Sequence, residues 1–124
     1  MLSVYRLFGV IYLVSGLWCG LQLDLASGFL GFQLASPAGF VEFFSVYGGL
    51  QVGLGMAMLV SSFRSDYVEA SLYFSAIFST FLLLFRVLSF AIYGLINDFI
   101  VMLIIEVVIF VGLWWAWFKA KSPA

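Results

Sequence analysis

Histidine is absent from this chain of 124 residues, and cysteine occurs only once, at Cys19. The absence of histidine removes the commonest protein ligand for metals and the usual proton shuttle at neutral pH. A single cysteine can form neither an internal disulfide nor a thiolate metal cluster. The sequence therefore indicates no cofactor, and we expect Cys19 to be a small buried apolar residue.

Charged residues are also scarce, because Asp, Glu, Lys and Arg together make up 9% of the chain. A soluble domain carries about 25%. The 5 basic and 6 acidic residues leave the chain nearly neutral, and no basic patch indicates binding to nucleic acid. Hydrophobic residues, by contrast, account for 65% of the chain. This composition is typical of an integral membrane protein.

Four long apolar stretches occupy most of the chain, over residues 2–23, 40–63, 68–93 and 98–118. Each provides the ~20 residues with which a helix crosses a hydrocarbon core. We therefore expect an all-α membrane protein, with residues 1–124 forming a single domain, an antiparallel bundle of four transmembrane helices. The first stretch is longer than the apolar core of a signal peptide, so it is expected to be a retained helix. The segment 24–39 contains Ser36-Pro37 and several glycines, which favour an irregular loop.

Basic residues are distributed unevenly between the two sides of such a protein. With four crossings, one side holds Arg6, Arg64, Lys119 and Lys121, whereas the loops 24–39 and 94–97 on the other side contain no Lys or Arg. The positive-inside rule therefore predicts that both termini are cytoplasmic.

Small residues mark the faces on which membrane helices approach each other closely. The first span contains Gly16-xxx-Gly20 and the second contains Gly49-xxx-Gly53, and we expect these two elements to pair. The third span has serines at every fourth position, at Ser71, Ser75 and Ser79. Two interpretations of the serines stay open: they form a packing face, or they line a polar path that leads towards Arg86.

Arg86 and Glu106 are isolated charges in the apolar interiors of the third and fourth spans. Arg86 lies eight residues before Gly94, and Glu106 lies eight residues after Asp98. At ~1.5 Å per residue, both are therefore roughly 12 Å below the same face of the membrane. An ionisable group at this depth costs on the order of 3 kcal/mol or more, which makes each a candidate functional residue. We predict that the two side chains form an ion pair.

The second span contributes further polar groups in the same outer half of the membrane. Tyr47 and Gln51 are four residues apart and hence lie on one helical face, and Gly48 and Gly49 would leave room beside them. In one interpretation, the ion pair is structural, and Tyr47 and Gln51 satisfy the remaining donors of Arg86. In the other, these residues form a pocket in which Arg86 meets the head of a small amphipathic ligand.

Three motifs in this order resemble one known family: Tyr47-Gly48-Gly49-Leu50-Gln51-Val52-Gly53-Leu54-Gly55, Phe85-Arg86-Val87-Leu88-Ser89, and the isolated Glu106. The chain is similar to an uncharacterised bacterial four-helix membrane-protein family, a domain of unknown function that is distantly DoxX-like. The resemblance covers nearly the whole chain in length, helix count and motif order. The family pattern also has an Arg shortly before the Tyr-Gly-Gly, where this chain has none. The resemblance implies the fold and a multi-pass location in the bacterial inner (cytoplasmic) membrane. Some DoxX-like relatives are linked to quinone or thiol redox systems.

The expected function is binding of a small amphipathic ligand, lipid or quinone-like, in an outer-half pocket formed by Arg86, Glu106, Tyr47, Gln51, Gly48 and Gly49. The alternative is a non-catalytic accessory subunit of a larger membrane complex. Catalysis has little support, because Glu106 and Tyr47 are the only acid–base candidates. Small multidrug exporters use a carboxylate in the middle of their first helix, and this chain has no acidic residue before Asp24. The expected partners are membrane lipid, the small ligand, and another membrane protein or a second copy of the chain.

Overall fold

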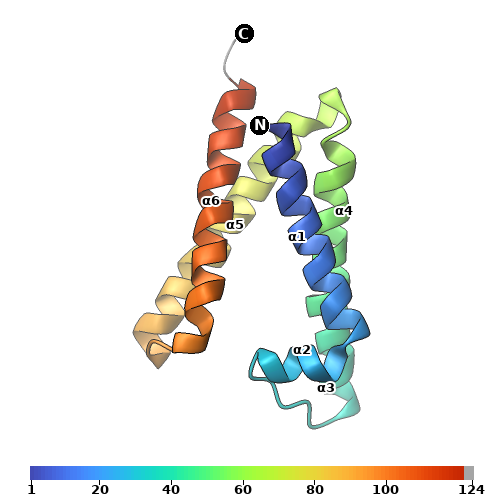
Figure 1. Cartoon of the computed structure of the whole chain (residues 1–124), viewed down its shortest axis with the longest axis vertical. Coiled ribbons are helices and arrows are strands. Elements are labelled where there is room, and N and C mark those ends of the chain that lie inside the picture. Colours follow the sequence, from blue (N-terminus) through green and yellow to red (C-terminus); the bar gives the residue numbers. More distant parts are fainter. Residues whose placement is uncertain (122–124) are drawn as a thin grey trace. The chain divides into compact units, whose positions relative to one another are not determined.

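The computed structural model describes residues 1–121, and its regular elements in this range are all helices (Figure 1). Their order is α1 (Leu2–Leu21), α2 (Leu23–Phe29), α3 (Pro37–Glu42), the π-helix η1 (Phe43–Leu50), α4 (Gln51–Ser61), α5 (Ser65–Tyr93), the 3-10 helix η2 (Asn97–Phe99) and α6 (Ile100–Lys121). Four helical stretches are long and apolar enough to cross a membrane: Leu2–Leu21, Pro37–Ser61, Ser65–Tyr93 and Asn97–Lys121. The expected all-α class with four membrane-length helices is confirmed.

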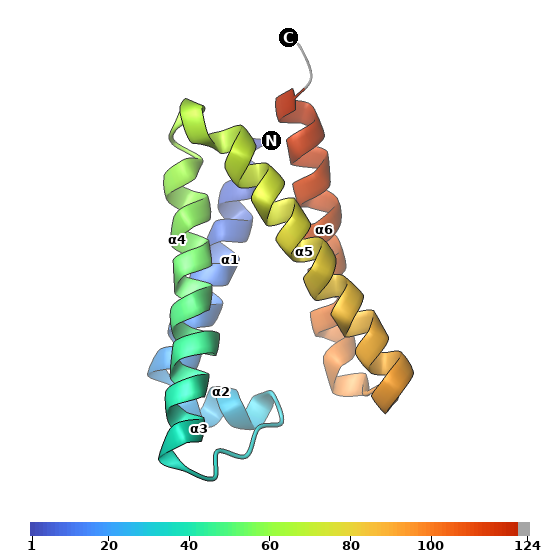
Figure 2. The same ribbon diagram turned by 180° about the vertical axis from the view of Figure 1, so that it is seen from behind.

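The chain divides into two compact units. One, here named the α5–α6 unit, consists of Met1–Tyr5 and the chain from Ser61 onward, and the other, the α1–α4 unit, consists of Arg6–Val60. In the first unit α5 and α6 form an antiparallel pair, and in the second α1 runs beside the continuous helix of η1 and α4 (Figures 1 and 2).

Small and hydroxyl-bearing residues are buried within the α5–α6 unit. Ala76 and Ser79 of α5 and Ala116 of α6 are buried. The Ser79 hydroxyl donates to the carbonyl oxygen of Ala76 at 2.9 Å, and the Tyr5 hydroxyl hydrogen-bonds to Ser71 and Ser75. Every buried polar side-chain atom in the described residues has a hydrogen-bond partner. The hydroxyls of the three serines are thus satisfied by Tyr5 and by the backbone of α5, which supports a packing face over the polar path.

Glycines bring the backbones of α1 and the η1–α4 helix together. A Cβ atom on Gly16 would lie 2.6 Å from the backbone nitrogen of Val52, and one on Gly55 would lie 2.6 Å from the carbonyl oxygen of Gly9. Real Cβ atoms essentially never come within 3.0 Å of another heavy atom. Any larger residue at Gly16 or Gly55 would therefore push the two helices apart.

Gly16-xxx-Gly20 contacts the η1–α4 helix as predicted, but the prediction that Gly49-xxx-Gly53 contacts α1 is wrong. No atom lies within 4 Å of a Cβ on Gly49 or Gly53, whereas a Cβ on Gly48 would lie 3.3 Å from the Cα of Gly20. The glycines that contact α1 are Gly48 and Gly55, which are seven residues apart. Seven residues are close to two helical turns, so Gly48 and Gly55 lie on one face of the helix. Gly49 and Gly53 do not lie on that face.

The segment 24–39, predicted to be an irregular loop, is helical at both ends. The first span stops at Leu21, because the backbone bends at Gln22 (φ −119°, ψ 56°) before α2 begins. At the other end, the Ser36 hydroxyl accepts a hydrogen bond from the Gly39 nitrogen at 3.4 Å, and Pro37 occupies the first turn, where its missing N–H costs nothing. Ser36-Pro37 therefore marks a helix start. The other predicted span ends agree with the structure to within about one helical turn.

An aromatic cluster joins the remaining loop to η1. Phe32 lies edge-on to Phe43 and Tyr47, with centroid distances of 5.5 and 5.1 Å. Phe43 and Tyr47 stack at 4.8 Å with an interplanar angle of 10°. Gly31 forms the turn after α2 with a φ of 82°. Residues with a Cβ atom rarely adopt this positive φ. Cys19 is buried beside this cluster, as expected.

Candidate functional site

Arg86 of α5 and Glu106 of α6 form an ion pair with side-on geometry. The Nη2 atom of Arg86 donates to Oε1 of Glu106 at 2.8 Å, and Nε donates to Oε2 at 3.1 Å and to Oε1 at 3.3 Å. Both carboxylate oxygens thus face one edge of the guanidinium, the geometry in which charge-assisted hydrogen bonds are strongest. The predicted contact between these two residues is confirmed.

The ion pair lies within the apolar part of both helices. Arg86 is seven residues before Tyr93, the last residue of α5, and Glu106 is six residues after Ile100, the first residue of α6. Both are therefore roughly 10 Å from their helix ends. α6 has no other charged residue before Lys119. Because a charge at this depth costs on the order of 3 kcal/mol, mutual pairing is what makes both side chains tolerable there.

Phe99, at the end of η2, also contacts the guanidinium. The Cζ atom of Arg86 lies 5.4 Å from the centroid of the Phe99 ring, within the range of a cation–π interaction. The Ser89 hydroxyl, by contrast, donates to the backbone carbonyl of Arg86 at 2.6 Å, so its hydrogen bond is made within α5 and not to the guanidinium. Phe99 was missed by the sequence analysis. The only sequence feature that could have indicated a contact with Arg86 is the position of Phe99 directly after the turn between the third and fourth spans.

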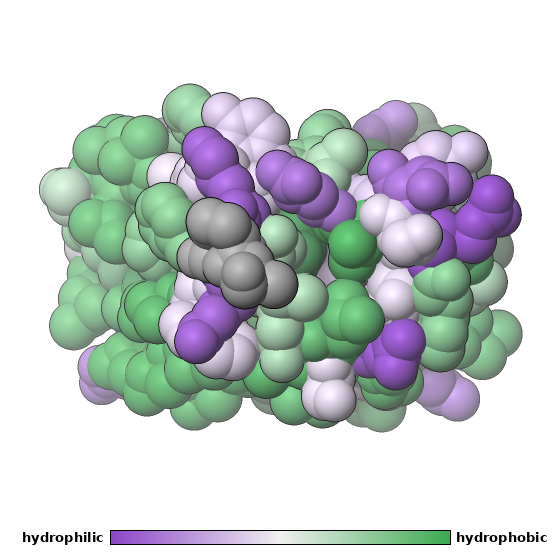
Figure 3. All heavy atoms as spheres, turned by 90° about the horizontal axis from the view of Figure 1, so that it is seen from above, coloured by the Kyte–Doolittle hydropathy of each residue, from purple (hydrophilic) through white to green (hydrophobic). Residues whose placement is uncertain are grey.

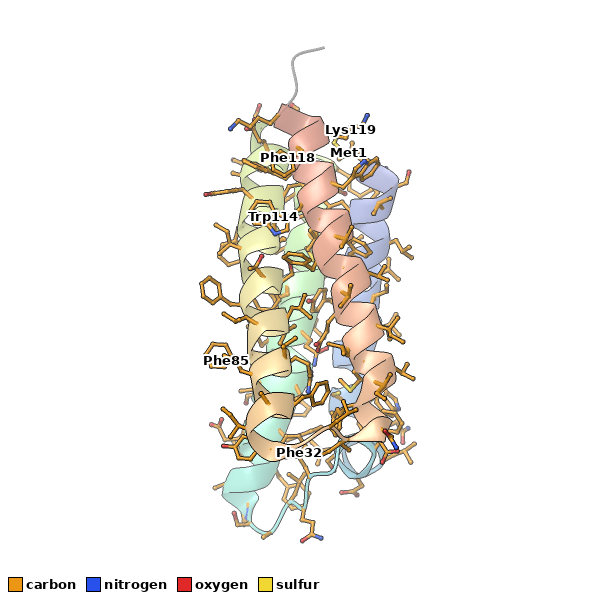
Figure 4. The ribbon with its side chains drawn as sticks, turned by 90° about the vertical axis from the view of Figure 1, so that its left-hand side faces the viewer. Met1, Phe32, Phe85, Trp114, Phe118 and Lys119 are labelled. Atoms are coloured by element: carbon orange, nitrogen blue, oxygen red, sulfur yellow. The ribbon has the colours of Figure 1, made fainter. Side chains whose placement is uncertain are left out.

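The two partners of the ion pair are unequally accessible. The side chain of Arg86 is 23% exposed and that of Glu106 is 11% exposed. Arg86 is therefore the more exposed member of the pair. The neighbouring Phe85 is 68% exposed and points away from the helix pair (Figure 4).

The other four predicted site residues belong to the α1–α4 unit: Tyr47, Gln51, Gly48 and Gly49. Their contact with the ion pair therefore stays a prediction. The ring of Tyr47 is held by the aromatic cluster, and Gly48 is buried against Gly20, so α1 occupies the room beside it. Gly49 is exposed and has open space where a side chain would be. Gln51 is half-buried.

Comparisons with protein-family models, with curated proteins and with solved structures found no match to this chain. The resemblance to DoxX-like proteins therefore remains an expectation from the sequence motifs. The chemistry of the site must be inferred from its own geometry, which is a fixed, accessible cation in an apolar setting.

Proposed function

We propose that this protein binds a small amphipathic molecule, a lipid or a quinone-like compound, whose polar or anionic head meets Arg86. The observation that carries the proposal is the guanidinium of Arg86, which is accessible and held side-on by Glu106 in the apolar part of two helices. A charge in a low-dielectric setting interacts strongly with a head group. Because both oxygens of Glu106 are already engaged by Arg86, a polar or anionic head is favoured over a cationic one.

Apolar surface adjoins the ion pair on both helices. Leu82 on α5, four residues before Arg86, and Ile105 on α6, next to Glu106, are exposed large hydrophobic residues. Apolar walls with a few polar groups are typical of sites for small amphipathic ligands. The resemblance to DoxX-like proteins, some of which are linked to quinone systems, favours a quinone-like compound within this class.

Native purification followed by mass spectrometry of the bound lipids and small molecules tests this function, with Gly49→Leu as the diagnostic variant. Gly49 is exposed and no atom lies within 4 Å of a Cβ placed on it, so we expect the fold to tolerate leucine there. We expect normal helix content and a reduced amount of co-purifying ligand, because leucine fills the proposed pocket without changing a charge. Gly28→Leu is the matched control, since Gly28 in α2 is equally open and lies outside the proposed pocket. Unchanged ligand content in well-folded Gly49→Leu protein would contradict the outer-half pocket.

We also propose that the protein lies in the bacterial inner membrane with both termini in the cytoplasm. The support is the distribution of Arg and Lys, which are absent from the loops 24–39 and 94–97. A reporter enzyme that works only in the cytoplasm is expected to be active when it is fused after Ala124. A reporter enzyme that works only in the periplasm is expected to be active when it is inserted after Leu95. Periplasmic activity of the C-terminal fusion would overturn the proposed orientation.

The second candidate function is that of a non-catalytic accessory subunit in a larger membrane complex. In the apolar windows of Ser65–Tyr93 and Asn97–Lys121, only 17% of the residues are buried within the chain itself. The uncovered surface of these helices is available to lipid or to a partner helix. A protein partner that stays bound at fixed stoichiometry during the same native purification would favour this candidate. A chain that carries only a small ligand would favour binding.

A further inference from the structure

A groove lies between the start of α5 and the end of α6, at the opposite end of these helices from the Arg86–Glu106 pair. Its volume is ≈ 330 Å³, and its lining residues are Asp66, Glu69, Ala70, Tyr73, Trp117 and Lys121. All six belong to the α5–α6 unit. The volume is within the range of sites for small ligands, roughly 300–1,000 Å³.

Aromatic rings form one wall of the groove and already hold a cation. The rings of Tyr73 and Trp117 are 5.0 Å apart, and the ammonium nitrogen of Lys121 lies 4.9 Å from the centroid of the Trp117 ring. Trp114 packs edge-on against Trp117 at 5.5 Å and donates its indole N–H to the Thr80 hydroxyl at 2.8 Å. Trp114 and Phe118 lie near this end of the helix pair (Figure 4). The Trp117 face is thus fixed in place and suited to an ammonium group.

Opposite charges face the groove without neutralising each other. Asp66 and Glu69 are exposed on α5, and Lys121 is exposed on α6. In the described part of the chain, no ion pair joins Lys121 to either carboxylate. Hydrophilic and hydrophobic surfaces lie side by side when this end is viewed from above (Figure 3). A ligand complementary to such a groove carries both an ammonium and an anionic group.

We propose that this groove binds the zwitterionic head group of a phospholipid, either phosphoethanolamine or phosphocholine. The ligand's ammonium group would replace that of Lys121 on the Trp117 ring and lie near the carboxylates of Asp66 and Glu69. Lys121 would then contact the phosphate. Tyr and Trp at the ends of membrane helices are typical of the head-group level, which is where such a ligand would be found. The site is separate from the Arg86–Glu106 pair and does not depend on its function.

A simpler account gives these charges only a role within the helices. Acidic residues near the start of α5 and lysines in the last turn of α6 complement the helix dipoles. That account predicts no preference among lipids with the same acyl chains. The two accounts therefore differ in a measurable selectivity.

The test is native mass spectrometry of the full-length protein in detergent, titrated with dioleoyl phosphatidylethanolamine or with dioleoyl phosphatidylglycerol. We expect the zwitterionic lipid to bind roughly fivefold more tightly, which is the difference that one exposed cation–π contact supplies. The double variant Asp66→Asn/Glu69→Gln is expected to remove this preference. Lys121→Gln is instead expected to weaken the binding of both lipids to the same extent, because both carry the phosphate that Lys121 would contact. All three residues are exposed, so the fold should be retained, and circular dichroism verifies it.

Matched substitutions outside the groove separate a binding site from a general effect of charge. Lys119→Gln removes a lysine from the same helical turn, and Trp115→Leu removes an exposed ring that does not line the groove. Both variants are expected to keep the preference, whereas Trp117→Leu loses it. The proposal is overturned by equal binding of the two lipids, or by equal effects of Lys119→Gln and Lys121→Gln. Substitution of Arg86 should leave this selectivity intact, so failure at one site is distinguishable from failure at the other.

Discussion

Replacement of Glu106 by leucine is expected to lower the free energy of unfolding by about 3 kcal/mol. The variant keeps the charge of Arg86 in the apolar part of α5 and removes the carboxylate that accepts its three hydrogen bonds. The measurement is a denaturant titration in detergent micelles, followed by circular dichroism. Asp98→Leu is the control, because Asp98 is exposed near a helix end, and its effect should stay within about 0.5 kcal/mol.

Removal of both charges should restore most of this loss. A buried ion pair can often be replaced by apolar residues of similar volume at little cost, so Arg86→Met/Glu106→Leu is expected to unfold within about 1 kcal/mol of the natural protein. If Glu106→Leu alone had no effect on unfolding, water or other contacts of the guanidinium would have to stabilise its charge. The ion pair would then not be the element that makes the charge of Arg86 tolerable.

Gly55→Ala is expected to destabilise the α1–α4 unit by about 1–3 kcal/mol, because the new methyl group overfills a close contact. Its Cβ atom would lie 2.5 Å from the backbone nitrogen of Leu13, and backbone atoms cannot move aside as a flexible side chain can. Gly53→Ala, on the same helix, meets no atom within 4 Å and should be neutral or stabilising by up to about 1 kcal/mol. The same titration measures both variants. Equal stabilities would contradict the backbone contact between α1 and α4.

The membrane-length helices and the ion pair could be predicted from the sequence because both depend on local properties. The length of an apolar run determines whether a helix can cross a membrane. The equal depths of Arg86 and Glu106 follow from the helical rise and from the short turn between their spans. No knowledge of side-chain packing was needed for either prediction.

The helix contacts were harder to predict, because they depend on the rotation of each helix about its axis. Gly49-xxx-Gly53 has the spacing of a common contact motif, yet the heptad-spaced Gly48 and Gly55 face α1. The second span changes from α3 to the π-helix η1 at Phe43, a change of helical pitch that hydrophobicity does not reveal. Phe99 could not be found either, since a ring beside a guanidinium has no characteristic sequence spacing.

The most direct test of the proposed ligand site is the ligand content of the Arg86→Met/Glu106→Leu protein after native purification. Mass spectrometry would compare its bound amphipathic molecules with those of the natural protein, at matched yield and matched unfolding free energy. We expect the double variant to be folded and stable but to have lost the ligand that the natural protein carries, because no cation remains to hold the head group. A double variant that is equally stable and carries the same ligand in the same amount would contradict the account and would leave the Arg86–Glu106 pair with a purely structural role.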